Sequence, residues 1–216
     1  MHVNKSTSAY RVPVAITRAP MRTVRPVMLR DVYADPAKEL ARMERNGALV
    51  RIGHGVYVAK PDQYGPQDSW SPPLEEAAMA YATAFHGDRV PVLVGIGAAR
   101  HHHAIPRAIG VTTVAVPHQR RPIDLDTGGR VVFTVRDPEV IDARPERGVI
   151  GTYLVATPEQ TLIDLVTNPE LGGMEAEART AATALRGRVD LARIERILGK
   201  ASIRARRAVS SFLGES

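Results

Sequence analysis

Basic side chains recur at helical spacing in the segment "DPAKELARMERNG", where they could neutralise the phosphates of a nucleic acid. At about 100° per residue, Lys38, Arg42 and Arg45 fall on one side of a helix, and Leu40 and Met43 fall on the other. The Asp-Pro pair that opens this segment and the Asn-Gly pair that closes it are standard start and stop signals, which predict a helix over 36–45. We expect one face of this helix to pack and the other to be cationic.

Two short β-branched runs, "LVRI" and "VYVA", follow this helix on either side of a Gly-His-Gly turn. Gly53 and Gly55 permit a tight reversal with His54 at its tip, and Arg51 shares one face of the hairpin with Tyr57. A helix followed by a basic hairpin is the outline of a winged helix-turn-helix, whose second helix enters the major groove of DNA. The alternative is an amphipathic helix with a solvated basic face and no partner.

The distribution of charge favours a polyanionic partner. The net charge is +6, yet residues 1–60 carry 11 Lys+Arg against 4 Asp+Glu, and residues 61–216 carry 18 against 19. Upstream arginines add to the basic set of the first 60 residues. The candidate DNA-binding residues are Arg22, Arg25, Arg30, Lys38, Arg42, Arg45, Arg51 and His54.

Other constellations give weaker signals for chemistry. Gly95 and Gly97 follow an apolar run, but Arg100 stands where a dinucleotide fingerprint needs its third glycine, so tight packing explains the glycines better. Three consecutive histidines, 101–103, point about 100° apart on a helix and cannot all bind one metal ion. We therefore predict no catalytic residue, no metal site and no cofactor.

Length and composition set the class of protein. The 216 residues include 44% hydrophobic residues and no cysteine, which fits a folded protein of a reducing cytoplasm. The N-terminus has no apolar signal segment, and no apolar run approaches the roughly 18 residues that a membrane span needs. We expect a cytoplasmic protein without a membrane partner.

The order of sequence patterns predicts a two-domain protein of mixed α/β (α+β) class. The stretch "PDQYGPQDSWSPP" predicts a linker over 61–73, between a winged helix-turn-helix domain (1–60) and a larger domain (74–216). In the larger domain, helical and β-branched runs mix over 73–156. A capping box at "TPEQ" opens a helix that ends before Pro169, and further helices are expected over about 173–186, 190–198 and 201–213.

Four segments together resemble the AbiEi family, antitoxins of AbiE-type (type IV) toxin–antitoxin and abortive-infection systems. They are the hairpin "NGALVRIGHGVYVAKP", the element "GIGAARHHHAIP", the segment "VATPEQTLIDLVTNPELGG" and the ending "VDLARIERIL…IRARRAVSSFLGE". The resemblance spans roughly 31–215.

This resemblance implies a division of labour between the two domains. The N-terminal winged helix would bind repeats in the operon's own promoter, as double-stranded DNA, and repress transcription. The C-terminal domain would counteract a nucleotidyltransferase toxin, without requiring a stable complex. Phage resistance by abortive infection is the implied role.

The second basic zone of the chain, 186–207, is a candidate for the toxin-neutralising surface. It holds 8 basic and 2 acidic residues, with the basic ones at three- or four-residue spacing if the helix continues across Gly199. The alternatives are a solvated face, contact with the toxin or its nucleic-acid substrate, and extra DNA contact. Together with two acidic residues of the "TPEQTLID" segment, the candidates are Glu159, Asp164, Arg193, Arg196, Lys200, Arg204 and Arg207.

Two further functions stay open on the sequence alone. The C-terminal domain could be an enzyme that modifies the toxin with a nucleotide in a phosphotransfer-like reaction, although the chain shows no phosphate-binding loop. The protein could also be a transcriptional regulator that senses a small ligand. Glu159 and Asp164 lie on different faces of their predicted helix and form no acid/base pair, which disfavours the enzyme.

Overall fold

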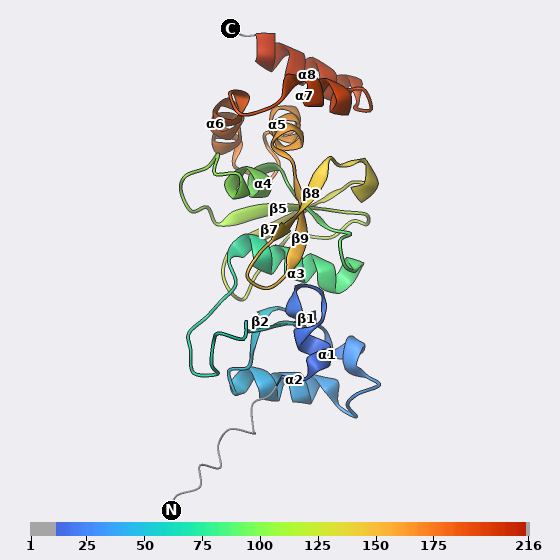
Figure 1. Cartoon of the computed structure of the whole chain (residues 1–216), viewed down its shortest axis with the longest axis vertical. Helices are drawn as coiled ribbons and strands as arrows, with labels where there is room; N and C mark the ends of the chain where they lie inside the picture. The colour runs from blue at the N-terminus through green and yellow to red at the C-terminus, as the bar shows by residue number, and fades with distance from the viewer. Residues whose placement is uncertain (1–11, 215–216) are drawn as a thin grey trace, which may run out of the picture.

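The computed structural model describes residues 12–214, so residues 1–11 of the predicted N-terminal domain and the end of the resemblance at Glu215 lie outside it. The chain forms an elongated stack of layers (Figure 1). A three-stranded sheet lies at the N-terminal end, a six-stranded sheet lies in the middle, and helices close the C-terminal end. The predicted mixed α/β class is confirmed.

The N-terminal unit begins with short helical turns and ends in a hairpin. Its elements are α1 (Val14–Thr17), η1 (Pro20–Arg22), β1 (Thr23–Val24), η2 (Pro26–Leu29), α2 (Pro36–Arg45), β2 (Leu49–Gly53) and β3 (Val56–Ala59). The strands are antiparallel in the order β1-β3-β2. The predicted helix over 36–45 is confirmed: the Asp35 side chain accepts a hydrogen bond from the Lys38 backbone N–H at its start.

The larger sheet is mixed, with the strand order β6-β7-β5-β4-β9-β8. Its strands are β4 (Val92–Val94), β5 (Val111–Val116), β6 (Ile123–Asp124), β7 (Arg130–Val135), β8 (Ala143–Arg147) and β9 (Thr152–Ala156). The pairs β4–β9 and β5–β7 are parallel, and the other pairs are antiparallel. The edge strands β6 and β8 were not predicted, because β8 contains Pro145 and charged residues that are tolerated mainly at an edge.

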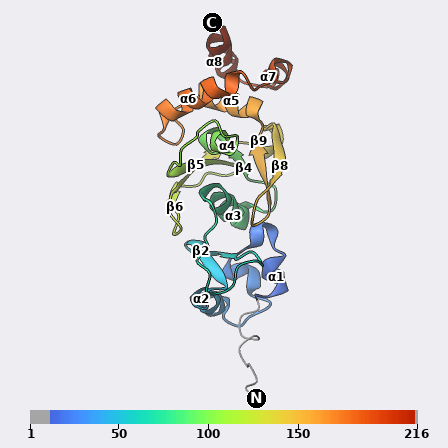
Figure 2. The same cartoon turned by 60° about the vertical axis from the view of Figure 1, so that its left-hand side comes forward.

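Helices cover both faces of this sheet (Figure 2). On one face lies α3 (Leu74–His86), and on the other lie α4 (Gly95–His101) and α5 (Pro158–Thr167). Beyond them, α6 (Glu175–Arg186), α7 (Leu191–Leu198) and α8 (Ile203–Gly214) form the C-terminal end, and η3 (Pro138–Val140) precedes β8. The four helices predicted after residue 157 are confirmed.

Helix α3 is buried on all sides because it lies between the two sheets. It contacts all three N-terminal strands and also β4 and β5 of the larger sheet. Ile52, Val56 and Val58 of the N-terminal hairpin belong to the same apolar core as Val92 and Val114 of the larger sheet. The core therefore runs across the predicted domain boundary, which stays a prediction.

Gly97 explains how α4 approaches the sheet so closely, and it generates a test. A Cβ built at Gly97 would lie 2.4 Å from the Thr112 hydroxyl oxygen and 3.2 Å from the Thr113 backbone nitrogen. The expected packing role of this glycine is thus confirmed. We predict that Gly97→Ala lowers the free energy of unfolding by about 1–3 kcal/mol through overpacking. The matched control Gly187→Ala, where nothing lies within 4 Å, should be neutral in urea unfolding.

Candidate nucleic-acid interface and the opposite pole

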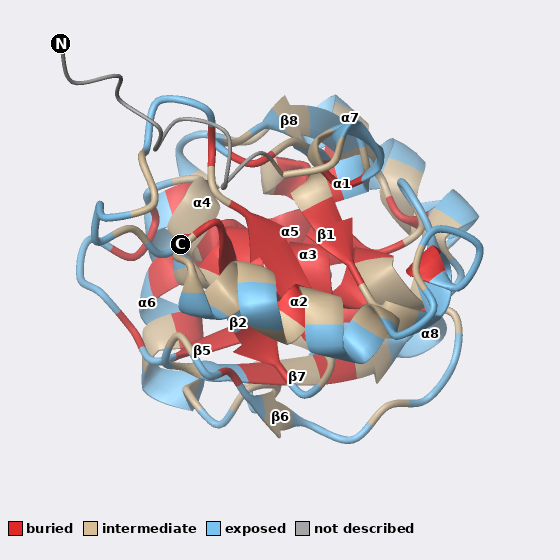
Figure 3. Ribbon diagram, turned by 90° about the horizontal axis from the view of Figure 1, so that it is seen from below, coloured by how far each residue is buried: buried red, intermediate tan, exposed pale blue. Residues whose placement is uncertain are grey.

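The outer face of α2 forms the N-terminal pole of the molecule. Seen from below, α2 lies across this end with buried layers behind it (Figure 3). Leu40 is fully buried and faces the sheet, whereas Lys38, Arg42 and Arg45 are exposed. Arg42 also donates to Glu39 one turn earlier, with the nitrogen and oxygen 2.7 Å apart. The predicted cationic face therefore exists, and Glu39 neutralises part of it.

Exposed apolar residues lie just before α2 in the chain, and the sequence analysis did not single them out. Val27, Met28 and Val32 are 45%, 50% and 55% exposed, and Arg30 in the same segment is also exposed. This segment is the short helical turn η2 and the loop after it, which have no regular hydrophobic period. Its sequence therefore carries no signal that would separate a buried from an exposed role. At the hairpin tip, His54 is exposed as predicted.

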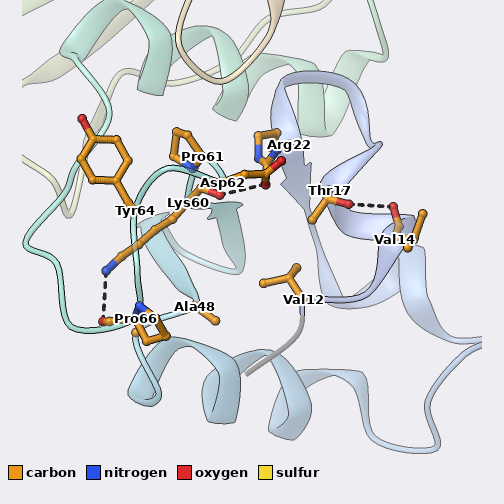
Figure 4. Close-up of a pocket in the computed structure, with 11 residues that line it drawn as sticks. Val12, Val14, Thr17, Arg22, Ala48, Lys60, Pro61, Asp62, Tyr64 and Pro66 are labelled. Carbon is orange, nitrogen blue, oxygen red and sulfur yellow. Dashed lines mark hydrogen bonds and ion pairs between the residues drawn. The ribbon is translucent and has the colours of Figure 1, made fainter. Parts of the chain in front are cut away.

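Arg22 differs from the exposed set because its guanidinium is turned inward. It donates to the backbone oxygens of Ala59 and Lys60. It also pairs with Asp62 at 2.8 Å (Figure 4). In the same close-up, Lys60 reaches the backbone oxygen of Pro66. These bonds hold the first residues of the predicted linker against the N-terminal unit, around a cavity of about 400 Å³.

Arg51 and Arg25 also make internal contacts. Arg51 pairs with Asp126 of the loop between β6 and β7 at 2.7 Å and lies 3.7 Å from Glu44 of α2. Arg25 stacks over the ring of Phe85 in α3, with its guanidinium carbon 3.8 Å from the ring centroid. Of the eight predicted DNA-binding residues, six are exposed: Arg30, Lys38, Arg42, Arg45, Arg51 and His54. Arg22, Arg25 and the exposed but ion-paired Arg51 join parts of the fold.

At the opposite pole, an ion-pair network attaches α7 to the larger sheet. Arg193 donates two hydrogen bonds to the Asp142 carboxylate, at 2.7 and 3.0 Å. The Thr157 hydroxyl donates to the same carboxylate at 2.7 Å. The hydrogen bonds from Arg193 are the main cause of a lowered pKa at Asp142, against the opposing effect of burial. Glu159 accepts a hydrogen bond from the backbone N–H of Asp190 at the start of α7.

Asp164 of α5 is buried. It pairs with Arg136 at 2.8 Å and accepts a hydrogen bond from the Gln160 amide at 2.9 Å. Burial raises the pKa of its carboxyl, and the charge of Arg136 opposes that change. Glu159 and Asp164, predicted as part of the toxin-neutralising surface, are buried, and Arg193 is partly exposed. All three make contacts within the fold that position helices.

The remaining predicted residues of this pole are exposed: Arg196, Lys200, Arg204 and Arg207. They do not form one continuous helical stripe, because α7 ends at Leu198 and α8 begins at Ile203. Arg204 donates to the backbone oxygen of Thr167 at the end of α5. Exposed apolar side chains stand beside these cations: Val140 is 63% exposed and Ile203 is 67% exposed.

The described residues contain neither a metal centre nor a membrane span. No group of three or more His, Asp or Glu side chains within residues 12–214 is placed to hold an ion. No helix in the same range is long and apolar enough to cross a bilayer.

Comparison with known proteins identifies the C-terminal part of the chain. Residues 92–215 match the family model described as the AbiEi antitoxin C-terminal domain. The crystal structure of the RV2827C protein from Mycobacterium tuberculosis is similar, with a TM-score of 0.60 and 19% sequence identity. That likeness covers 89% of this chain and 71% of the other, and at such identity it concerns the fold alone. No curated protein matches the chain.

The Asp142–Arg193 pair predicts how stability depends on pH. Because the folded pKa of Asp142 lies below its ordinary value of 3.8, the pair stabilises the fold above that value. The stabilisation is lost as the pH falls through the lowered pKa. Asp142→Asn should lower the free energy of unfolding by about 1.5–3 kcal/mol at pH 7, from the loss of charged hydrogen bonds.

The difference between Asp142→Asn and the wild type should stay constant above pH 3.8 and shrink as the pH falls below 3.8 through the lowered pKa of Asp142, in urea melts at matched ionic strength. Asp137→Asn is the matched control, because Asp137 is exposed and its carboxylate accepts only from the Glu139 backbone N–H. A constant difference across that pH range would contradict the assigned role of Asp142.

Proposed function

The chain belongs to the AbiEi antitoxin family, and on that premise we propose that it is a type IV antitoxin with two working ends. The N-terminal pole binds double-stranded DNA in the promoter of its own operon and represses transcription. The C-terminal pole counteracts a nucleotidyltransferase toxin. The family match supports the antitoxin role directly, and the DNA and toxin assignments are our proposals.

One observation carries the DNA assignment: the outermost layer of the N-terminal pole is a helix with an exposed cationic face. Lys38, Arg42 and Arg45 point away from the core on α2, which is followed by a hairpin and completed by a three-stranded sheet. This order of elements suits a winged helix-turn-helix, with α2 as the helix that enters the major groove and His54 at the wing tip. Arg30 would contact the phosphate backbone.

The exposed apolar segment before α2 fits the same assignment. In the major groove, apolar side chains can contact the methyl groups of thymine. Val27, Met28 and Val32 would therefore contribute to base discrimination, whereas the cations mainly position the helix on the duplex. Two of the predicted contacts, Arg22 and Arg51, pair with carboxylates and are assigned to holding parts of the fold together.

For the toxin, we propose the surface formed by Arg196, Lys200, Arg204 and Arg207, with Val140 and Ile203 as apolar contacts. The mixture of exposed cations and exposed apolar side chains suits a partner with an acidic, partly apolar surface. Asp142, Glu159 and Asp164 position the helices that present this surface.

DNA binding is tested with the double variant Arg42→Ala/Arg45→Ala. We expect promoter binding, measured by fluorescence anisotropy, to fall by at least tenfold, and the slope of log K against log salt to decrease by about 1.8 for two phosphates. Rescue from the toxin should be intact in co-expression. Normal repression by this variant would show that α2 is not the DNA-contacting helix.

The toxin assignment is tested with the reverse experiment. Arg196→Ala/Arg207→Ala changes two exposed cations at the other pole, so promoter binding and its salt slope should equal those of the wild type. Toxin rescue should be lost, as measured by growth during co-expression with the adjacent nucleotidyltransferase gene. Full rescue by this variant, with loss of rescue by Arg42→Ala/Arg45→Ala, would place toxin neutralisation at the N-terminal pole instead.

A further inference from the structure

Two arginines from distant parts of the chain stack on one aromatic ring. The guanidinium carbon of Arg25 lies 3.8 Å from the centroid of the Phe85 ring, and that of Arg120 lies 3.7 Å from it. Two guanidinium groups at such distances cannot share one face of a ring without overlapping. Phe85 is therefore sandwiched, with Arg25 from the N-terminal unit on one side and Arg120 from the β5–β6 loop on the other.

These two arginines differ from the other internally placed arginines in their polar partners. Arg22, Arg51 and Arg193 each pair with a carboxylate, which neutralises the charge. In the described part of the chain, the guanidiniums of Arg25 and Arg120 have ring contacts alone, with no ion pair and no hydrogen bond to protein. A stacked guanidinium still presents its N–H groups along its edge, where a phosphate can accept two of them.

Positive charge accumulates around the sandwich. Arg121 and His118 in the same loop are exposed, and the ring of His118 lies 6.4 Å from that of His86, next to Phe85. Burial, Arg120 and His118 together lower the pKa of His86, which favours its neutral form, so the positive charge at this place comes from the arginines. In the loop that carries Arg120, the nearest acidic residue is Asp124, which pairs with Arg130 at 3.1 Å. Asp88, three residues after Phe85, is exposed and lies 3.8 Å from Arg89.

The sheet register places this cluster beside the hairpin tip. Val24 lies opposite Tyr57, so Arg25 follows at the end of β3 that adjoins the turn at His54. On the other strand of the hairpin, a Cβ at Gly53 would lie 2.9 Å from the ring of Tyr81, which packs on Phe85 with centroids 5.0 Å apart. The tip of the proposed wing and the Arg25–Phe85–Arg120 sandwich thus share one edge of the molecule.

We propose that this edge is a second phosphate-binding site for the same DNA, in which Arg25, Arg120 and Arg121 contact the duplex backbone beside the wing. The inference rests on the proposed promoter binding and extends it to the antitoxin body. Stacking on Phe85 holds the two guanidiniums in fixed orientations, so little side-chain freedom is lost when a phosphate binds. The contact recognises backbone and is independent of base sequence.

The experiment uses the full-length protein and two duplexes of equal length, one carrying the sequence upstream of its own gene and one unrelated. Arg120→Gln and Arg121→Gln are compared with the matched control Arg144→Gln, an exposed arginine on β8 at the opposite edge of the sheet. Each of the first two should weaken binding to both duplexes by about three- to tenfold and reduce the salt slope by about 0.9. Arg144→Gln should leave both quantities unchanged.

Two outcomes separate this inference from the proposed function. If the wild type and all three variants bind the upstream duplex with equal slopes, and Arg42→Ala/Arg45→Ala does not bind, the sandwich is structural alone and α2 keeps its role. If the folded wild type binds neither duplex, both proposals fail. Arg121 contacts no ring, so Arg121→Gln tests the site even if Arg120→Gln lowers the melting temperature.

Discussion

The burial of one helix between two sheets determines the shape of this protein. Helix α3 has small residues at Ala77, Ala78, Ala80 and Ala82, all fully buried, which lets both sheets approach it closely. A helix that is apolar on all sides must be covered on all sides. Helix α3 covers the N-terminal hairpin on one side and the larger sheet on the other, so the two sheets share one apolar core. This shared core fixes the orientation of the N-terminal unit relative to the larger sheet.

Arginine serves three distinct purposes in this fold, and its surroundings decide which. Where a carboxylate or carbonyl oxygen is close, as for Arg22 and Arg193, the guanidinium holds two segments together. Where an aromatic ring is close, as for Arg120, the charge is stacked and its N–H edge stays available. Where neither is close, as for Arg45, the charge faces solvent. The excess charge of the first 60 residues therefore overstates the number of cations that a partner can contact.

The sequence predicts the elements whose signals are local. Helix α2 follows from its Asp-Pro start and its period, and α5 follows from its capping box, which the structure shows as a hydrogen bond from the Gln160 backbone N–H to the Thr157 hydroxyl. It did not predict β6 and β8, since edge strands tolerate charge and proline. Nor could it divide the arginines into inward and outward sets, because Asp126 and Phe85, which hold Arg51 and Arg25, are distant in the chain.

The segment between residues 61 and 73 has a consequence for the proposed control of the operon. Lys60 binds the backbone oxygens of Pro66 and Asp68, and Gly47 packs against the Pro66 carbonyl, so the segment is folded back along the N-terminal unit. Because this segment is held against the N-terminal unit and α3 packs against both sheets, the two poles keep a fixed separation. A duplex at one end and a protein at the other would be carried together without competing for space. Under the proposed function, transcription would then follow the amount of antitoxin in the cell, whatever its ratio to the toxin.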